Sequence, residues 1–268
     1  MPTLETVQSA DGTPIAVWRS GDGPPLVLLH GTAADHARWA PVLPAFEERL
    51  TVLAVDRRGR GESGDASDWA IEREFEDVAA VAAYAGKGTS VLGHSFGAIC
   101  ALQGALLAPP LRALVLYEPP VAAGVASDEV IARLEELLAA GERDRLLALF
   151  MAEVAGVAPA QIEVMRGQPS WEARLAAAHT IPRELRAANE ERFDPAAFGG
   201  LGVPALVLSG DASRPSFMRA AAAVAAGLPD GRLVTMPGQG HTAMDTATEL
   251  FVSEVLAFLG PRGGPPGG

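Results

Sequence analysis

Cysteine and long apolar runs are scarce in this chain of 268 residues. Cys100 is the only cysteine, which excludes an intramolecular disulfide and a cysteine-based metal site. No stretch approaches the roughly 18 uninterrupted apolar residues that a membrane-spanning helix needs. The first residues, Met1 to Glu5, lack the basic region and apolar segment of a secretory signal peptide. We therefore expect a cytoplasmic protein that has no membrane partner.

Positive charge is also in short supply. The chain has 21 Lys and Arg against 33 Asp and Glu, a formal net charge of −12, and Lys87 is its only lysine. Binding to nucleic acid or to an anionic membrane depends on basic patches, so this balance argues against both. The expected partner is a small-molecule substrate, with no metal and no cofactor, and the oligomeric state stays open between monomer and dimer.

The stretch around Ser95 organises the chain. An apolar run from Ser90 to Leu92 leads into Gly93-His94-Ser95-Phe96-Gly97, and a segment with helical spacing follows from Ala98 to Ala108. Such a chain must turn sharply from strand to helix, and side chains at positions 93 and 97 would clash there. The G-x-S-x-G pattern resembles the nucleophile elbow of the α/β-hydrolase family. A passive serine in an ordinary strand-to-helix turn is the alternative.

Apolar runs and helical patterns alternate along most of the chain, which favours a doubly wound, mostly parallel sheet. Two short strands, Leu4 to Ser9 and Ile15 to Arg19, read as an antiparallel hairpin before it. The family resemblance implies an α/β-hydrolase core over residues 1–118 and 201–260. It also implies an inserted helical lid over 119–200, and the Gly- and Pro-rich residues 261–268 read as a flexible tail.

The resemblance extends to two loops and to the order of the catalytic residues. His30-Gly31-Thr32-Ala33 follows an apolar strand, where the family's oxyanion loop lies, and Asp56 opens a D-x-x-G-x-G-x-S loop. Asp56 and the glycines of that loop are expected to make turns, with the three arginines as a less favoured acidic-substrate site. The resemblance implies that the backbone N–H groups of Thr32 and Phe96 hold the oxyanion, with Ala33 as the fallback donor.

A serine nucleophile needs a base, and the base needs an orienting acid. Among five histidines, His241 lies in a Gly-flanked loop after the last strand, where the family places its base. The acid has two candidates. Asp211, at the end of the strand before the last one, is preferred over Glu118, at the end of the strand after the elbow helix.

Residues around this predicted centre are candidates for the substrate pocket, although simple packing is the alternative for each. His30 is expected to brace its loop rather than to take part in chemistry. The pocket candidates are His30, Ala33, Tyr117, Phe150, Met151, Trp171 and Met244.

The predicted reaction is acyl transfer through an acyl-enzyme on Ser95. A mainly apolar lid favours a small, mostly apolar carboxylic ester or lactone. Thioester hydrolysis, carbon–carbon bond hydrolysis and cofactor-free peracid formation use the same residues and stay open, as does a ligand-binding or signalling protein without turnover. A serine at position 95 excludes the family members that need an aspartate nucleophile there.

Overall fold

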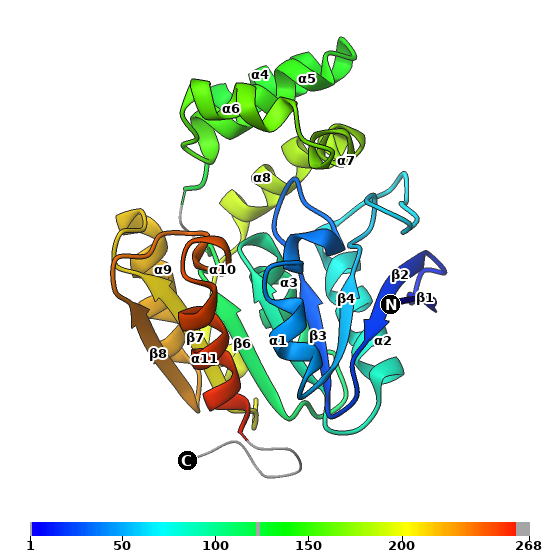
Figure 1. The fold of residues 1–268 in the computed structure, drawn as a ribbon, viewed down its shortest axis with the longest axis vertical. Coiled ribbons are helices and arrows are strands. Elements are labelled where there is room, and N and C mark those ends of the chain that lie inside the picture. The colour runs from blue at the N-terminus through cyan, green and yellow to red at the C-terminus, as the bar shows by residue number, and fades with distance from the viewer. Residues whose placement is uncertain (1, 122–123, 261–268) are drawn as a thin grey trace.

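A computed structural model describes residues 2–121 and 124–260 of the chain. Its centre is an eight-stranded sheet in the order β1-β2-β4-β3-β5-β6-β7-β8 (Figure 1). The pairs β1·β2 and β2·β4 are antiparallel, and every other neighbouring pair is parallel. The predicted hairpin and the doubly wound, mostly parallel sheet are confirmed. The strands are β1 (Thr3–Gln8), β2 (Pro14–Ser20), β3 (Pro25–Leu29), β4 (Thr51–Val55), β5 (Ser90–His94), β6 (Ala113–Tyr117), β7 (Ala205–Gly210) and β8 (Gly231–Met236).

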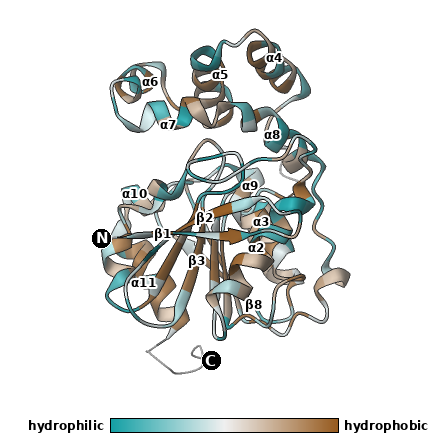
Figure 2. Cartoon of the chain, turned by 90° about the vertical axis from the view of Figure 1, so that its right-hand side faces the viewer, coloured by the Kyte–Doolittle hydropathy of each residue, from teal (hydrophilic) through white to brown (hydrophobic). Residues whose placement is uncertain are grey.

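Helices cover both faces of this sheet, because successive side chains of a strand point to opposite sides. In β5, Val91 belongs to a cluster with α2 and α3, whereas Leu92 belongs to a second cluster with α1 and α11. The register pairs Val91 with Leu114 and Leu92 with Val115, so paired residues of β5 and β6 lie on the same face of the sheet and in the same cluster. Figure 2 shows the apolar residues concentrated along these central strands. The helices of the core are α1 (Leu43–Glu47), α2 (Ile71–Ala85), α3 (Phe96–Gly104), α9 (Pro215–Gly227), α10 (Ala243–Thr246) and α11 (Thr248–Leu259), with the short helix η1 (His36–Trp39).

The segment from Trp39 to Leu50 is not the continuous helix that its spacing suggests. It divides into η1 and α1, with Pro41 between them and Pro44 in the first turn of α1. Proline lacks an N–H and restricts the residue before it, so it is tolerated at a helix start but not in a helix interior. The last helical segment of the described chain is likewise divided, at Ala247, into α10 and α11.

A layer of helices lies above the core between β6 and β7 (Figure 1), and we call its residues 124–198 the helical insertion. Ile131, Leu134, Leu146, Leu147 and Ile181 lie in its own apolar core. Helix α6 was not expected from the sequence; Pro159 stands at its start, a position that suits proline. The elements of the insertion are α4 (Asp128–Ala139), α5 (Arg143–Leu149), η2 (Phe150–Val154), α6 (Pro159–Arg166), α7 (Ser170–Ala176), η3 (Ala178–Thr180), α8 (Ile181–Glu190) and η4 (Pro195–Phe198).

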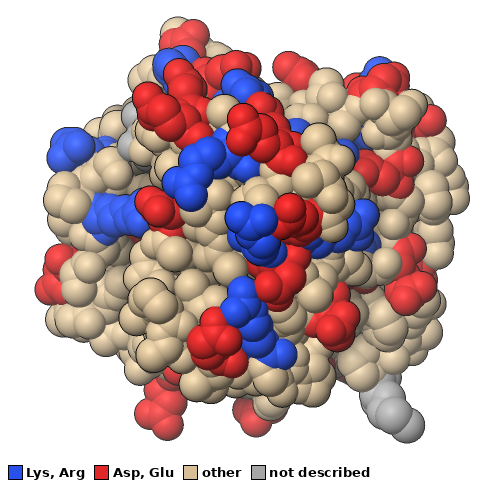
Figure 3. All heavy atoms as spheres, turned by 90° about the horizontal axis from the view of Figure 1, so that it is seen from above, with Lys and Arg blue, Asp and Glu red and all other residues tan. Residues whose placement is uncertain are grey.

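The helical insertion occupies the interval in which the sequence predicts a lid; its action as a lid stays a prediction. The predicted tail, 261–268, lies outside the described residues. Seen from above, acidic and basic side chains are interspersed over the molecule (Figure 3). Arg186–Glu135 and Arg166–Asp144 are two of the ion pairs whose side chains are at least partly exposed to solvent. None of the described helices is both long and apolar enough to cross a membrane.

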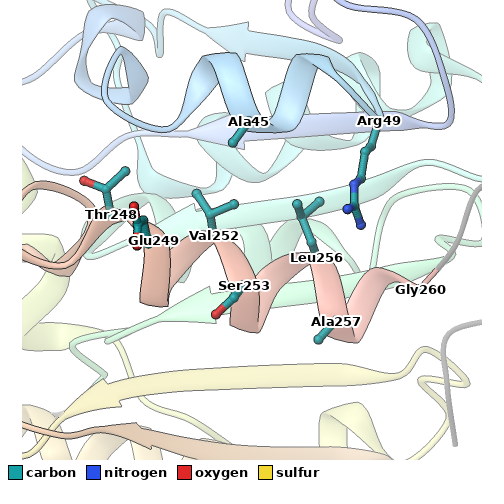
Figure 4. Close-up of a pocket in the computed structure, with 9 residues that line it drawn as sticks. All are labelled: Ala45, Arg49, Thr248, Glu249, Val252, Ser253, Leu256, Ala257 and Gly260. Atoms are coloured by element: carbon teal, nitrogen blue, oxygen red, sulfur yellow. The ribbon is translucent and has the colours of Figure 1, made fainter.

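A surface groove lies between α1 and α11 (Figure 4). Arg49 and Glu249 contribute polar groups to it, and Val252 and Leu256 contribute apolar ones. None of its lining residues is among the predicted site residues, so the groove is separate from the candidate site described next.

Candidate active site

Ser95 lies at the junction of β5 and α3 in a strained backbone conformation, with φ 56° and ψ −125°. A Cβ on Gly93 would lie 2.3 Å from the Gly97 carbonyl oxygen, and a Cβ on Gly97 would lie 2.4 Å from the His30 oxygen. Both glycines are therefore required by close backbone contact, as the sequence suggested. Ser95 is partly exposed between buried neighbours, and its N–H donates to the Tyr117 oxygen at 2.9 Å.

Phe96, whose amide is a predicted oxyanion donor, is the first residue of α3. The first N–H groups of a helix have no partner within it, and the helix dipole favours negative charge there. The phenyl ring is buried and has the Arg57 guanidinium 4.6 Å from its centroid. The side chain is thus held in the core while the backbone starts the helix beside Ser95.

The His30–Ala33 loop passes directly against Ser95. A Cβ on Gly31 would lie 3.0 Å from the Ser95 Cβ, so glycine is what permits this approach. Thr32 is partly exposed, whereas Ala33 is fully buried and has a positive φ of 54°. The structure therefore brings the predicted oxyanion loop and the predicted nucleophile together.

His30 is fully buried and braces this loop. The Arg57 N–H donates to His30 Nε2 at 3.2 Å, so Nδ1 carries the proton and donates to the Gly31 oxygen at 2.8 Å. Burial first, and then the charge of Arg57, hold the pKa of His30 well below its usual range. The bracing role is as expected, and the full burial of His30 argues against its place in the substrate pocket.

His241 lies in the loop between β8 and α10, and its Nδ1 is 2.5 Å from Glu118 Oε2. The His94 and Phe217 rings lie 4.6 and 4.9 Å from the His241 ring, centroid to centroid. His94 also reaches the His241 carbonyl oxygen through Nε2, at 2.8 Å. Ring packing and the contact with Glu118 thus hold an imidazole that remains partly open to solvent.

Glu118 is fully buried and immediately follows β6. Its Oε1 accepts hydrogen bonds from the Gly210 N–H, at 2.9 Å, and from the Ser213 hydroxyl. Burial by itself would raise the pKa of Glu118, but the hydrogen bond from His241 and those from Ser213 and Gly210 hold it below its usual range. The group is a buried, ionised carboxylate with a partner on each oxygen.

The preference for Asp211 over Glu118 as the partner of His241 is corrected by this geometry. Asp211 is exposed, and its Oδ1 accepts from the Gly238 N–H at 2.6 Å. The chain turns after Gly210, so Asp211 closes a surface turn while the Gly210 N–H faces Glu118. Glu118, which follows the neighbouring strand β6 and has a positive φ of 48°, contacts the His241 ring instead.

The remaining pocket candidates divide into two groups, and all of them are buried. Ala33, Phe150, Met151 and Trp171 share the apolar cluster of the helical insertion, so they lie where the insertion meets the oxyanion loop. Tyr117 and Met244 belong to the cluster with α1 and α11. The Tyr117 hydroxyl donates to the Gly240 oxygen and accepts from the Ala243 N–H, so Tyr117 supports the His241 loop rather than a pocket wall.

A group of buried charges beside the loop was not expected from the sequence. Arg57 donates to both oxygens of Glu74, and Arg57 and Arg60 both pair with Glu184 of α8. All four side chains are at most 3% exposed. The arginines of the Asp56 loop therefore meet protein carboxylates, and Asp56 binds the N–H groups of His36 and Glu62, as predicted for a turn. No group of three metal-ligating side chains occurs among the described residues.

Comparison with known proteins identifies the family of this chain. The family model described as "Alpha/beta hydrolase family" matches residues 26–254. The chain belongs to the α/β-hydrolase family, and the prediction of a hydrolase is confirmed.

Three similar proteins cover nearly the whole chain. An α/β hydrolase structure from Sphaerobacter thermophilus is 37% identical with a TM-score of 0.80, over 94% of this chain and 100% of that one. A pimeloyl-[acyl-carrier protein] methyl ester esterase from Stenotrophomonas maltophilia is 31% identical, over 83% of this chain and 87% of its own. A 2-(acetamidomethylene)succinate hydrolase from Mesorhizobium japonicum is 24% identical, over 91% of this chain and 90% of its own.

Proposed function

We propose that this protein is a serine hydrolase that cleaves a small, mostly apolar carboxylic ester or lactone through an acyl-enzyme on Ser95. The observation that carries the proposal is the contact of 2.5 Å between His241 Nδ1 and the buried Glu118 carboxylate, in a chain whose Ser95 occupies a strained elbow at the end of β5. A buried carboxylate that fixes one imidazole nitrogen leaves the other to take the serine proton.

The steps follow the placement of these groups. His241 Nε2 takes the proton of the Ser95 hydroxyl as its oxygen attacks the ester carbonyl, and Glu118 stabilises the imidazolium. The N–H groups of Phe96 and Thr32 hold the oxyanion. Collapse of the tetrahedral intermediate expels the alcohol, which takes the proton from His241. Water then attacks the acyl-enzyme with His241 again as the base, and the acid leaves.

The ester preference has two supports. The Stenotrophomonas relative is named as a methyl ester esterase, and it is 31% identical over 83% of this chain. The helical insertion also presents Phe150, Met151 and Trp171 in one apolar cluster with Ala33 of the oxyanion loop. In this proposal the insertion acts as a lid with an apolar underside.

A second candidate is hydrolysis of an acylamino-substituted succinate. It is favoured by the Mesorhizobium relative, whose name states such a substrate and which matches 91% of this chain. The scissile bond then differs, while Ser95, His241 and Glu118 keep the same tasks.

The experiment is hydrolysis of a p-nitrophenyl ester series, from acetate to decanoate, by the wild type and by Ser95→Ala. We expect kcat to fall by about 10⁶-fold in Ser95→Ala, since the nucleophile is removed. Ser127→Ala is the matched control, because Ser127 caps α4 and is exposed. Equal rates in the wild type and Ser95→Ala would disprove the nucleophile. Binding of an ester without product would favour a protein without turnover, and preference for acetamidomethylene succinate would favour the second candidate.

A further inference from the structure

Arg174, in α7 of the helical insertion, reaches across to the oxyanion loop. Its Nη1 donates to the Ala33 carbonyl oxygen at 2.7 Å. Within residues 2–121 and 124–260, Arg174 makes no ion pair, and its buried Nε has no hydrogen-bond partner. Burial, followed by the charge of Arg38, lowers the pKa of Arg174. Arg174 is partly buried, and the Asp35 and Asp245 carboxylates act on its charge without forming an ion pair with it, so its direct contact with one backbone carbonyl needs an explanation.

Ala33 is the residue that needs such support. Its φ of 54° is in the left-handed region, which is unfavourable for a residue with a Cβ and persists only where the surroundings enforce it. Ala33 is fully buried, and it packs with Phe150, Met151 and Ile181 of the insertion. The insertion therefore holds Ala33 both by its side chain and by its carbonyl.

His30, the first residue of the loop, is held by Arg57, which is itself paired with the insertion. Arg57 donates its N–H to His30 Nε2 and its Nη1 to the His30 oxygen, at 3.2 Å each. Glu184 of α8 is paired with that same Arg57 and is fully buried. Glu184 thus reaches His30 through Arg57, and Arg174 reaches Ala33 directly. These two contacts hold the residues on either side of Gly31 and Thr32, and Gly31 lies against Ser95.

We propose that Arg174 is a positioning residue for the oxyanion hole. Its guanidinium fixes the Ala33 carbonyl and thereby the peptide planes that aim the Thr32 N–H at the oxyanion on Ser95. The inference rests on the proposed function, since it assigns a task in the same acyl transfer. This role links the helical insertion to catalysis, because a movement of the insertion away from the core would break the hydrogen bond between Arg174 and the Ala33 carbonyl.

Arg174→Ala tests this role, and two other arginines serve as matched controls. Arg143 donates to the Ala176 oxygen within the insertion, at 3.3 Å, and Arg183 of α8 pairs with Asp65 of the core. With p-nitrophenyl esters we expect kcat of Arg174→Ala to fall about 10- to 100-fold with KM changed less than about 3-fold, because a misplaced donor weakens the transition state alone. Arg174→Lys should recover part of kcat, and Arg143→Ala and Arg183→Ala should stay within about 3-fold.

A transition-state analogue separates positioning from folding. A trifluoromethyl ketone forms a hemiketal oxyanion on Ser95, whereas the matching methyl carbinol does not. The inhibition constant of the ketone should rise by about the same factor as kcat/KM falls in Arg174→Ala, and that of the carbinol should not change.

Several results would overturn the inference while leaving the proposed function intact. One is a loss of kcat in Arg183→Ala equal to that in Arg174→Ala, which would indicate that any contact between the insertion and the core has this effect. Another is a rise in KM at constant kcat in Arg174→Ala. An unchanged ketone affinity in Arg174→Ala would do the same. If Arg174→Ala does not fold, wild-type kcat in a folded Arg174→Met, which has no donor for the Ala33 carbonyl, is decisive against the proposal. An inactive wild type, or an active Ser95→Ala, would instead remove the proposed function itself.

Discussion

Glu118 and Asp211 hold corresponding places in the sheet and have very different surroundings. Each follows the last residue of a parallel strand, β6 for Glu118 and β7 for Asp211, and the two strands are neighbours. Glu118 is fully buried and contacts His241, whereas Asp211 is exposed and accepts from the Gly238 N–H. The difference shows that the turn after the strand, and not the position at the strand end, decides which carboxylate contacts His241.

The turn acts through backbone groups. Gly210 ends β7, and a Cβ there would lie 2.0 Å from the Gln239 oxygen. Only glycine therefore fits at position 210, where the backbone lies against the loop that carries His241. That passage turns the Gly210 N–H toward Glu118 and leaves Asp211 on the surface. Gly210 therefore donates a hydrogen bond to Glu118 and also places the Asp211 side chain on the surface, away from His241.

Among the changes that test the comparison of Glu118 with Asp211, Glu118→Gln is expected to have the largest effect on activity. This change keeps the shape of the side chain but removes the charge that stabilises the imidazolium, so kcat should fall by about 10³- to 10⁴-fold. Asp211→Asn, the matched change on the other strand, should stay within about 3-fold. Steady-state hydrolysis of a p-nitrophenyl ester measures both.

The double variant sharpens the same comparison. If Asp211 has no part in catalysis, Glu118→Gln combined with Asp211→Asn is no slower than Glu118→Gln alone. A further loss in the double variant would mean that Asp211 replaces the missing carboxylate, and a large loss in Asp211→Asn alone would reverse our assignment.

A second difference should appear in stability against acid. The pKa of Glu118 lies below its usual range, so its ionised form favours the folded state. This stabilisation is complete above the unfolded pKa, near 4.5, and is lost as the pH falls through the lower folded value. The free energy of unfolding should therefore decrease more in the wild type than in Glu118→Gln between pH 6 and pH 3. Urea denaturation at both pH values measures this, and equal decreases would contradict a depressed pKa at Glu118.

The fold was predictable because local patterns decide it. The apolar runs at Pro25–Leu29 and Thr51–Val55 are buried strands, and a Cβ on either glycine flanking Ser95 would lie within 2.5 Å of a backbone oxygen. The break between η1 and α1 at Pro41 is also local, because proline lacks an N–H and does not suit a helix interior. These features depend on neighbours in sequence, which is the information that a sequence carries directly.

The pairing of charges was not predictable in the same way. Glu184 reads as one of several acidic residues on a helix, a pattern typical of a solvated face, yet it is fully buried against Arg57 and Arg60. The choice between Glu118 and Asp211 also depends on a contact across 123 residues. The one available signal was the presence of three arginines in the Asp56 loop, which need carboxylates if they are buried.

The smallest expected effect concerns Ser213, whose hydroxyl donates to Glu118 Oε1. Ser213→Ala removes one of the donors that hold this carboxylate, while the Gly210 N–H and the Ser209 hydroxyl remain. We expect kcat to fall about 3- to 10-fold with KM unchanged, because a less firmly held Glu118 orients His241 less well. Ser216→Ala, on a partly exposed serine in the first turn of α9, is the control for a lost hydroxyl in the same segment. A loss in Ser213→Ala as large as that in Glu118→Gln would show that Ser213 acts on more than the carboxylate. No loss at all would show that the two remaining donors suffice to hold Glu118.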